Sequence, residues 1–192
     1  MADSSNIWAS TRHADAGTFY AAPLDTVLPT TAVGALDAAF EDHGWLGEEG
    51  ITNAQTRDTT KHKSFGGDTV KVTQDNYEET IQVTLLESNP VTLATVFGDD
   101  NVTVTDTGGH RTVRVDHESA MLPRKSFVVR VIDGVKTRLI IIPEGQVTTV
   151  DDIVHVHSDL LAYTITIDVF KPAGGGPAVY ELIDEPDVVT TP

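Results

Sequence analysis

A chain of 192 residues can bury one main hydrophobic core, and a second domain would have to be small. The absence of cysteine excludes disulfides, thiolate metal sites and thiol catalysis. Lys and Arg number 13 against 29 Asp and Glu, and the formal charge of -16 argues against binding to the outside of nucleic acid, where phosphates need cations. No apolar run of about 18 residues and no secretion-signal pattern occurs, so we expect a soluble chain without a membrane segment.

The charge is unevenly distributed along the chain. Residues 110–138 carry seven basic and three acidic side chains, whereas residues 37–50 carry five acidic ones and no Lys or Arg. These segments are either two independently solvated faces or complementary patches that meet between copies of the chain. The candidate basic interface residues are Arg111, Arg114, Arg124, Lys125 and Arg130, and the candidate acidic ones are Asp37, Glu41, Asp42, Glu48 and Glu49.

The first half of the chain predicts an arm, a helix, a loop and a strand. Residues 1–29 contain Pro23 and Pro29 and predict an extended arm with at most one strand. Apolar side chains at helical spacing predict a short helix over residues 32–42, which Gly44 would stop. Residues 51–66 are polar and aperiodic, which indicates a long excursion away from the core, and residues 69–73 alternate like a strand. In EETIQVTLL, residues 78–86, apolar positions alternate with Thr80, Gln82 and Thr84, which predicts a strand with one buried and one wet face.

The second half predicts one more helix and a series of strands. Ser88 or Asn89 can cap a helix that begins at Pro90 and ends before Gly98. Strand-like runs follow at residues 102–106, 111–116, 126–132, 135–142, 152–157 and 163–170. Asp133-Gly134 predicts a hairpin over residues 127–142 with a type I′ turn. Residues 172–192 combine a Gly/Pro linker with an acidic end and predict a flexible tail.

Candidate chemistry is sparse. His155 and His157 lie two apart on a predicted strand and could share a face and bind a metal, but no Glu follows at the spacing that cupin enzymes use. The glycine clusters lack the Lys-Ser/Thr of a phosphate loop, and no G-x-S-x-G elbow holds a serine. We therefore predict no catalytic, cofactor-binding or metal site.

One ordered set of motifs covers about a third of the chain. It consists of WLGEEGI at residues 45–51, an Arg-Asp-Thr loop from Arg57, an aromatic-Gly-Gly turn at residues 65–67, the alternating strand, and a short helix ending in Phe-Gly at Gly98. In this order the motifs resemble the major tail tube proteins of long-tailed, non-contractile bacteriophages, particularly those infecting actinobacteria. The resemblance implies a virion protein that is assembled in the host cytoplasm.

The resemblance also implies a fold and an assembly. The expected fold is mainly β (α+β), an antiparallel sandwich or barrel with one or two short helices over residues 30–171, forming hexameric rings that stack into a tube. Four strands from each of six subunits, at about 4.8 Å spacing, would enclose a bore of roughly 37 Å across backbones, through which double-stranded DNA could pass. Expected partners are further copies of the chain and the tape-measure, tail terminator and distal tail proteins.

The family implies roles for two segments. Residues 52–66 correspond to an arm that reaches the next ring, and their charged residues Arg57, Asp58, Lys61, His62 and Lys63 could meet an acidic patch there. The face of Thr80, Gln82 and Thr84 is a candidate lumen surface, because a wall of carboxylates and hydroxyls repels phosphates instead of binding them. Two other readings stay open: a virion decoration or binding module with a β-sandwich fold, and a metal-dependent β-barrel enzyme using His155 and His157.

Overall fold

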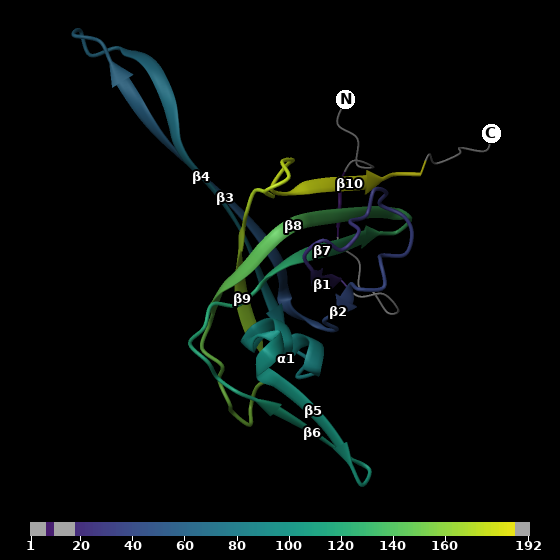
Figure 1. Cartoon of the computed structure of the whole chain (residues 1–192). Helices are drawn as coiled ribbons and strands as arrows, with labels where there is room; N and C mark the ends of the chain where they lie inside the picture. The colour runs from purple at the N-terminus through teal and green to yellow at the C-terminus, as the bar shows by residue number, and fades with distance from the viewer. Residues whose placement is uncertain (1–6, 10–17, 187–192) are drawn as a thin grey trace, which may run out of the picture.

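A computed structural model describes residues 7–9 and 18–186 of the chain (Figure 1). Its strands form an antiparallel eight-stranded sheet in the order β2-β1-β7-β8-β9-β4-β3, in which β10 also pairs with β8, and a separate β5-β6 sheet. The prediction of a mainly β, antiparallel fold is confirmed, and the sheet of the single chain is open. The elements are β1 (Phe19–Pro23), β2 (Glu41–Asp42), β3 (Leu46–Lys63), β4 (Thr69–Leu85), α1 (Pro90–Phe97), the 3-10 helix η2 (Asp99–Asn101), β5 (Val102–Thr107), β6 (His110–Val115), β7 (Arg124–Asp133), β8 (Lys136–Val150), β9 (Tyr163–Val169) and β10 (Tyr180–Asp184).

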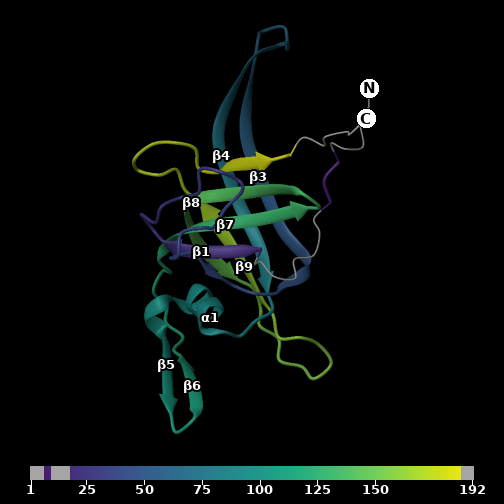
Figure 2. The ribbon, with the colours of Figure 1, turned by 90° about the vertical axis from the view of Figure 1, so that its right-hand side faces the viewer.

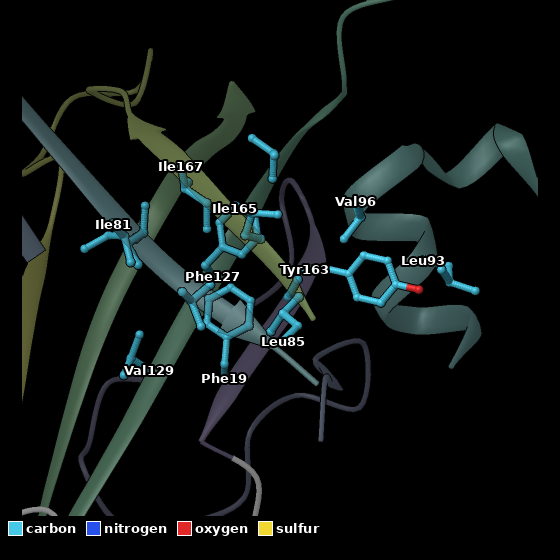
Figure 3. Packing of buried hydrophobic residues seen from close by; sticks show 14 residues of the cluster. Phe19, Ile81, Leu85, Leu93, Val96, Phe127, Val129, Tyr163, Ile165 and Ile167 are labelled. Atoms are coloured by element: carbon cyan, nitrogen blue, oxygen red, sulfur yellow. The ribbon is translucent and has the colours of Figure 1, made fainter. Parts of the chain in front are cut away.

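The main core lies on one face of the curved sheet. Alternate residues of β4, β7 and β9 point into it, as period-two patterning requires, and Phe19 stacks on Phe127 with ring centroids 5.7 Å apart (Figure 3). The prediction that apolar residues of β4 form a buried face is confirmed. Packing is tight around Gly145, where an added Cβ would lie 2.8 Å from Ile167 and 3.0 Å from Phe127.

A second, smaller core lies on the other face of β1, β7 and β8. It contains Tyr20, Val128 and Ile141, and the loop segment before β3 covers it with Leu28, Leu36 and Phe40. The predicted helix over residues 32–42 is wrong, because this segment forms turns and the short strand β2. Gly34 has φ 126° and the Asp37 carboxylate accepts from the Ala39 amide, and both features compete with helical backbone.

Helix α1 forms where the sequence predicts it. The Asn89 side chain accepts a hydrogen bond from the Thr92 amide, Pro90 begins the helix, and Gly98 ends it with φ 103°. Leu93 and Val96 are buried, and Figure 3 shows them beside Tyr163 of β9. The helix therefore closes one end of the main core.

An adjacent face of α1, with Thr92 and Thr95, packs against a buried histidine. His43 follows β2, is fully buried, and its Nε2 atom lies 2.9 Å from Thr95 Oγ1. Its ring meets Phe19 edge-on at 5.0 Å. Burial first, and the charge of Lys125 second, lower the pKa of His43 to about 4. The ring is thus neutral near pH 7 and ties β2 to the helix.

The predicted hairpin of β7 and β8 is confirmed, but its turn is shifted by one residue. Asp133 pairs with Lys136, so the two-residue loop is Gly134-Val135. Gly134 has φ 60°, whereas Val135 does not have a positive φ. A glycine at the first loop position fits a type II′ turn, and the predicted type I′ turn is wrong.

Two other segments differ from the prediction. Residues 151–156 are not a strand, so the expected strand over residues 152–157 is wrong. Conversely, residues 180–184 of the predicted flexible tail form β10, with Leu182 opposite Leu139 of β8. The N-terminal segment predicted over residues 1–29 and the tail predicted over residues 172–192 lie partly outside the described residues. The domain boundaries at residues 29–30 and 171–172 stay predictions.

Residues 7–9 contact residues from the C-terminal half of the chain. Trp8 Nε1 donates to Glu185 Oε1 at 3.0 Å, and the Trp8 ring lies under Arg138 at 4.8 Å and Lys136 at 5.4 Å. The Ala9 amide donates to Asp133 at 3.1 Å. These contacts fasten residues 7–9 to the β7-β8 hairpin and to the residue that follows β10.

Candidate functional site

A polar face covers the outside of the sheet formed by β3, β4 and β9. Thr80, Gln82 and Thr84 alternate with buried residues of β4, as the sequence predicts. Pairing places them opposite Asp168, Thr166 and Thr164 of β9, and places Gln82 opposite Thr52 of β3. Thr84 and Thr164 are joined by a hydroxyl hydrogen bond of 2.8 Å. The three predicted residues therefore belong to one surface that spans three strands.

This surface, which we call the polar face, carries no positive charge. Its members on paired positions are residues 52, 54, 56 and 58 of β3, residues 76, 78, 80, 82 and 84 of β4, and residues 164, 166 and 168 of β9. None of these is Lys or Arg, and three of them, Asp58, Glu78 and Asp168, are carboxylates. A surface of hydroxyls, amides and carboxylates offers phosphates no counter-charge.

Beyond β9, strands β3 and β4 continue as a hairpin, which we call the arm. From Gln55 opposite Glu79 to Lys63 opposite Thr69 the two strands pair only with each other, and residues 64–68 form the turn. Figures 1 and 2 show the arm projecting away from the body. Nine strand residues, 55–63, extend about 30 Å. The predicted excursion is confirmed as a geometric feature, but it is a paired hairpin with two register shifts, between Asp58 and Thr59 and between His62 and Lys63, and not an aperiodic loop.

The predicted charged residues of this segment lie along the arm. Arg57 is near its root, where its guanidinium lies 4.6 Å from the Tyr77 ring centroid. Asp58 is on the polar face, and Lys61, His62 and Lys63 lie toward the tip, where His62 Nε2 is 3.0 Å from Thr73 Oγ1. Their role in contacts between copies stays a prediction.

The root of the arm is fixed by a buried carboxylate that sequence reasoning missed. Glu79 is only 7% exposed, and it accepts hydrogen bonds from Asn53 at 2.9 Å, Gln55 at 3.1 Å and Tyr77 at 2.7 Å. Burial by itself raises the pKa of Glu79, but these bonds and the Arg57 charge outweigh burial, and the pKa lies below its ordinary value. Residues 52–60 and 74–80 are polar on both faces, so no alternation in the sequence singles out the members of this cluster.

The predicted acidic residues are all exposed but lie in two segments. Asp37, Glu41 and Asp42 precede β3, and the last two pair with Ala21 and Tyr20 of β1. Glu48 and Glu49 lie in the irregular start of β3, where the pairing with β4 shifts register.

The predicted basic residues are spread over three places. Arg111 and Arg114 lie on the projecting β5-β6 hairpin, Arg124 and Lys125 begin β7, and Arg130 lies farther along β7. Most of them have partners within the chain: Arg114 pairs with Asp116, Arg124 with Glu144 and Lys125 with Asp99, while Arg130 donates to the Gly34 carbonyl. The structure does not bring them together as one patch, and their interface role stays a prediction.

The metal hypothesis loses its structural basis. His155 and His157 lie outside any strand, so the argument that they share a face no longer holds. Among the described residues, no three His, Asp or Glu side chains are grouped to hold a metal ion. In that same part of the chain, no helix has the length and hydrophobicity to cross a membrane.

Comparisons with known proteins give one decisive match. A profile of the phage tail tube protein family matches residues 6–190. Two solved structures are similar to the chain: the virion of a native gene transfer agent particle (12% identity, TM-score 0.41, 78% of this chain and 92% of that one) and the tube-terminating cap of the anti-feeding prophage (9% identity, TM-score 0.45, 96% and 100%). No curated protein matches.

Proposed function

The chain belongs to the phage tail tube protein family and is a non-enzymatic structural protein of the virion tail, and from this premise we propose that it forms hexameric rings that stack into a tube conducting double-stranded DNA. The tube is that of a long-tailed, non-contractile phage. Tape-measure, terminator and distal tail proteins are the other expected partners.

The polar face is the observation that carries this proposal, because it suits the wall of a DNA conduit. It lacks Lys and Arg over three strands and has carboxylates on each of them. Six copies carry a formal charge of 6 × -16 = -96 per ring. Phosphates passing such a wall are repelled, so the duplex slides and does not bind.

The edges of the sheet suit closure around a ring. β3 ends the strand order, and residues 147–150 of β8 pair with β9 while the pairing of β7 with β8 stops at Gln146. The four strands β3, β4, β9 and β8 alternate in direction. β8 of one copy would therefore meet β3 of the next in antiparallel orientation, which removes both exposed edges.

The arm has the length to reach a neighbouring ring. It extends about 30 Å beyond β9, and the Glu79 cluster makes its root rigid. Lys61 and Lys63 near its tip are attracted to acidic residues such as Asp37 or Glu48 on the next copy.

Shortening the arm tests the stacking of rings. Residues 59–75 are replaced by Asn-Gly, which joins Asp58 to Asn76, a pair already opposite each other in the hairpin. The Glu79 cluster is kept, so we expect the variant subunit to fold, and circular dichroism checks this. We expect no tubes of the variant in negative-stain electron micrographs, and normal tubes would contradict the stacking role.

Added positive charge tests the conduit. Gln82 and Thr166 face each other across β4 and β9, so Gln82→Lys with Thr166→Lys places two cations per copy on the polar face. Variant tubes should retain fluorescent duplex DNA on sedimentation, and the retention should fall steeply with salt. The matched control places lysines at Thr103 and Thr105 of the exposed β5-β6 hairpin. Equal retention by both variants would refute the placement of the polar face at the lumen.

A further inference from the structure

A groove is present in the loop segment that covers the smaller core. It has a volume of about 280 Å³. Its walls are held in place by hydrogen bonds from Arg130 to the Gly34 carbonyl and from Tyr180 to the Pro29 carbonyl, both of 3.3 Å. Val27 and Val33 at its walls are 72% and 58% exposed. It is lined by residues 27–31, residues 33–37 and Leu139, and we call it the 27–37 groove.

The arm tip presents an unburied aromatic side chain. Phe65 lies in the turn of the arm and is fully exposed, at 111% of its reference area. The turn that carries it is ordered by hydrogen bonds from the Ser64 amide to the Asp68 carbonyl at 2.8 Å and from the Gly67 amide to the Ser64 carbonyl at 2.9 Å. A phenylalanine that is held in an ordered turn and exposed to solvent is available to bind a groove on another molecule.

We propose that Phe65 of one copy docks in the 27–37 groove of a second copy. This inference rests on the proposed stacking function and names the receiving surface for the arm. The arm projects away from the body of its own chain (Figures 1 and 2), so Phe65 requires a groove on another chain. The groove offers the apolar side chains of Val27, Val33 and Leu139 as packing partners, and an aromatic side chain that packs into such a groove is a common anchor of a protein interface.

The two surfaces are opposite in charge. The tip, residues 59–72, has Lys61, Lys63 and Lys71 against Asp68, a balance of 3 - 1 = +2. The lining of the 27–37 groove contains Asp37, and the wider segment of residues 24–42 adds Asp25, Glu41 and Asp42 with no Lys or Arg, a balance of -4. Arg130 is the cation that contacts this segment from β7, and with it the balance is -3. Attraction between the tip and the groove rim would steer the arm and set its register.

The lack of cysteine makes the contact testable by cross-linking. Purified Ser64→Cys protein, which keeps the Phe65 ring and places a thiol beside it in the exposed turn, is mixed with Val33→Cys protein that carries a mass tag. The mixture is oxidised at a concentration that supports assembly, and heterodimers are resolved on a non-reducing gel. We expect several-fold more heterodimer than in a control mixture of Ser64→Cys with tagged Val104→Cys, whose cysteine is exposed on β5. Heterodimer no more abundant than in the control would overturn the docking.

A second variant measures the contribution of the ring. Phe65→Ala should raise the protein concentration needed for assembly by about 30-fold, the size of an interface hot spot, and Phe65→Leu should restore most of it. Because Phe65 is fully exposed, the fold of the subunit should not change. Unchanged assembly of Phe65→Ala would also overturn the docking.

These outcomes separate the docking from the function. If the wild-type chain forms tubes and the short-arm variant does not, the absence of the cross-link refutes the docking and leaves ring stacking in place. If the cross-link forms in a sample without rings or tubes, the docking is supported and the proposed hexameric assembly fails.

Discussion

Acid should destabilise the subunit through His43. The pKa of this residue falls from 6.5 to about 4 on folding, chiefly because burial penalises the charged ring. At pH values between 4 and 6.5, His43 binds a proton in the unfolded chain but not in the folded chain. The contribution of His43 to the free energy of unfolding is therefore fully present above pH 6.5 and is lost as the pH falls toward 4. At 1.36 kcal/mol per pH unit, 2.5 units correspond to about 3 kcal/mol, with about 1.4 kcal/mol lost by pH 5.5.

The measurement is urea unfolding at pH 7.5, 5.5 and 4.5 for the wild type and His43→Gln. Carboxylates titrate in both proteins, so the difference between their free energies of unfolding isolates the histidine. We expect the wild-type advantage to shrink by about 2 to 3 kcal/mol from pH 7.5 to 4.5. His110→Gln is the matched control, because His110 is exposed on the β5-β6 hairpin. A wild-type advantage over His43→Gln that does not change with pH would refute the reasoning.

Three further substitutions, two of them with a matched control, probe the packing. Gly145→Ala should lower the free energy of unfolding by about 1 to 3 kcal/mol because its Cβ would meet two core side chains, whereas Gly174→Ala, with nothing within 4 Å, should change it little; urea unfolding checks both. Asn89→Ala should cost about 1 kcal/mol through loss of the α1 cap, read from the thermal midpoint. Trp8→Ala should speed amide hydrogen exchange in β10, because it removes a hydrogen bond and two cation-π contacts, and the exposed Val135→Ala in the nearby turn should not.

Local chemistry made several elements predictable from sequence. Asn89, Pro90 and Gly98 define the ends of α1 by their own hydrogen bonds and backbone angles, so they need no tertiary information. The alternation around Gln82 likewise makes the polar face predictable, since every second residue of a strand must point away from the core.

The errors arose where tertiary contacts decide. Leu36 and Phe40 have helical spacing, but they cover the smaller core from a looped backbone. Residues 152–157 alternate like a strand, yet no neighbouring strand pairs with them in the described structure. The Glu79 cluster depends on the register between β3 and β4, which the sequence of either strand leaves open. The 27–37 groove depends in the same way on hydrogen bonds from β7 and β10.

The hydrogen bond between Thr84 and Thr164 bears on friction in the proposed conduit. Each hydroxyl on the polar face has one hydrogen that could be given to a phosphate oxygen. In this pair one hydrogen is already committed to the neighbouring strand, so only one is left to engage a passing backbone. At this pair the surface therefore offers a moving polyanion one hydrogen-bond donor instead of two, which adds to the effect of its negative charge.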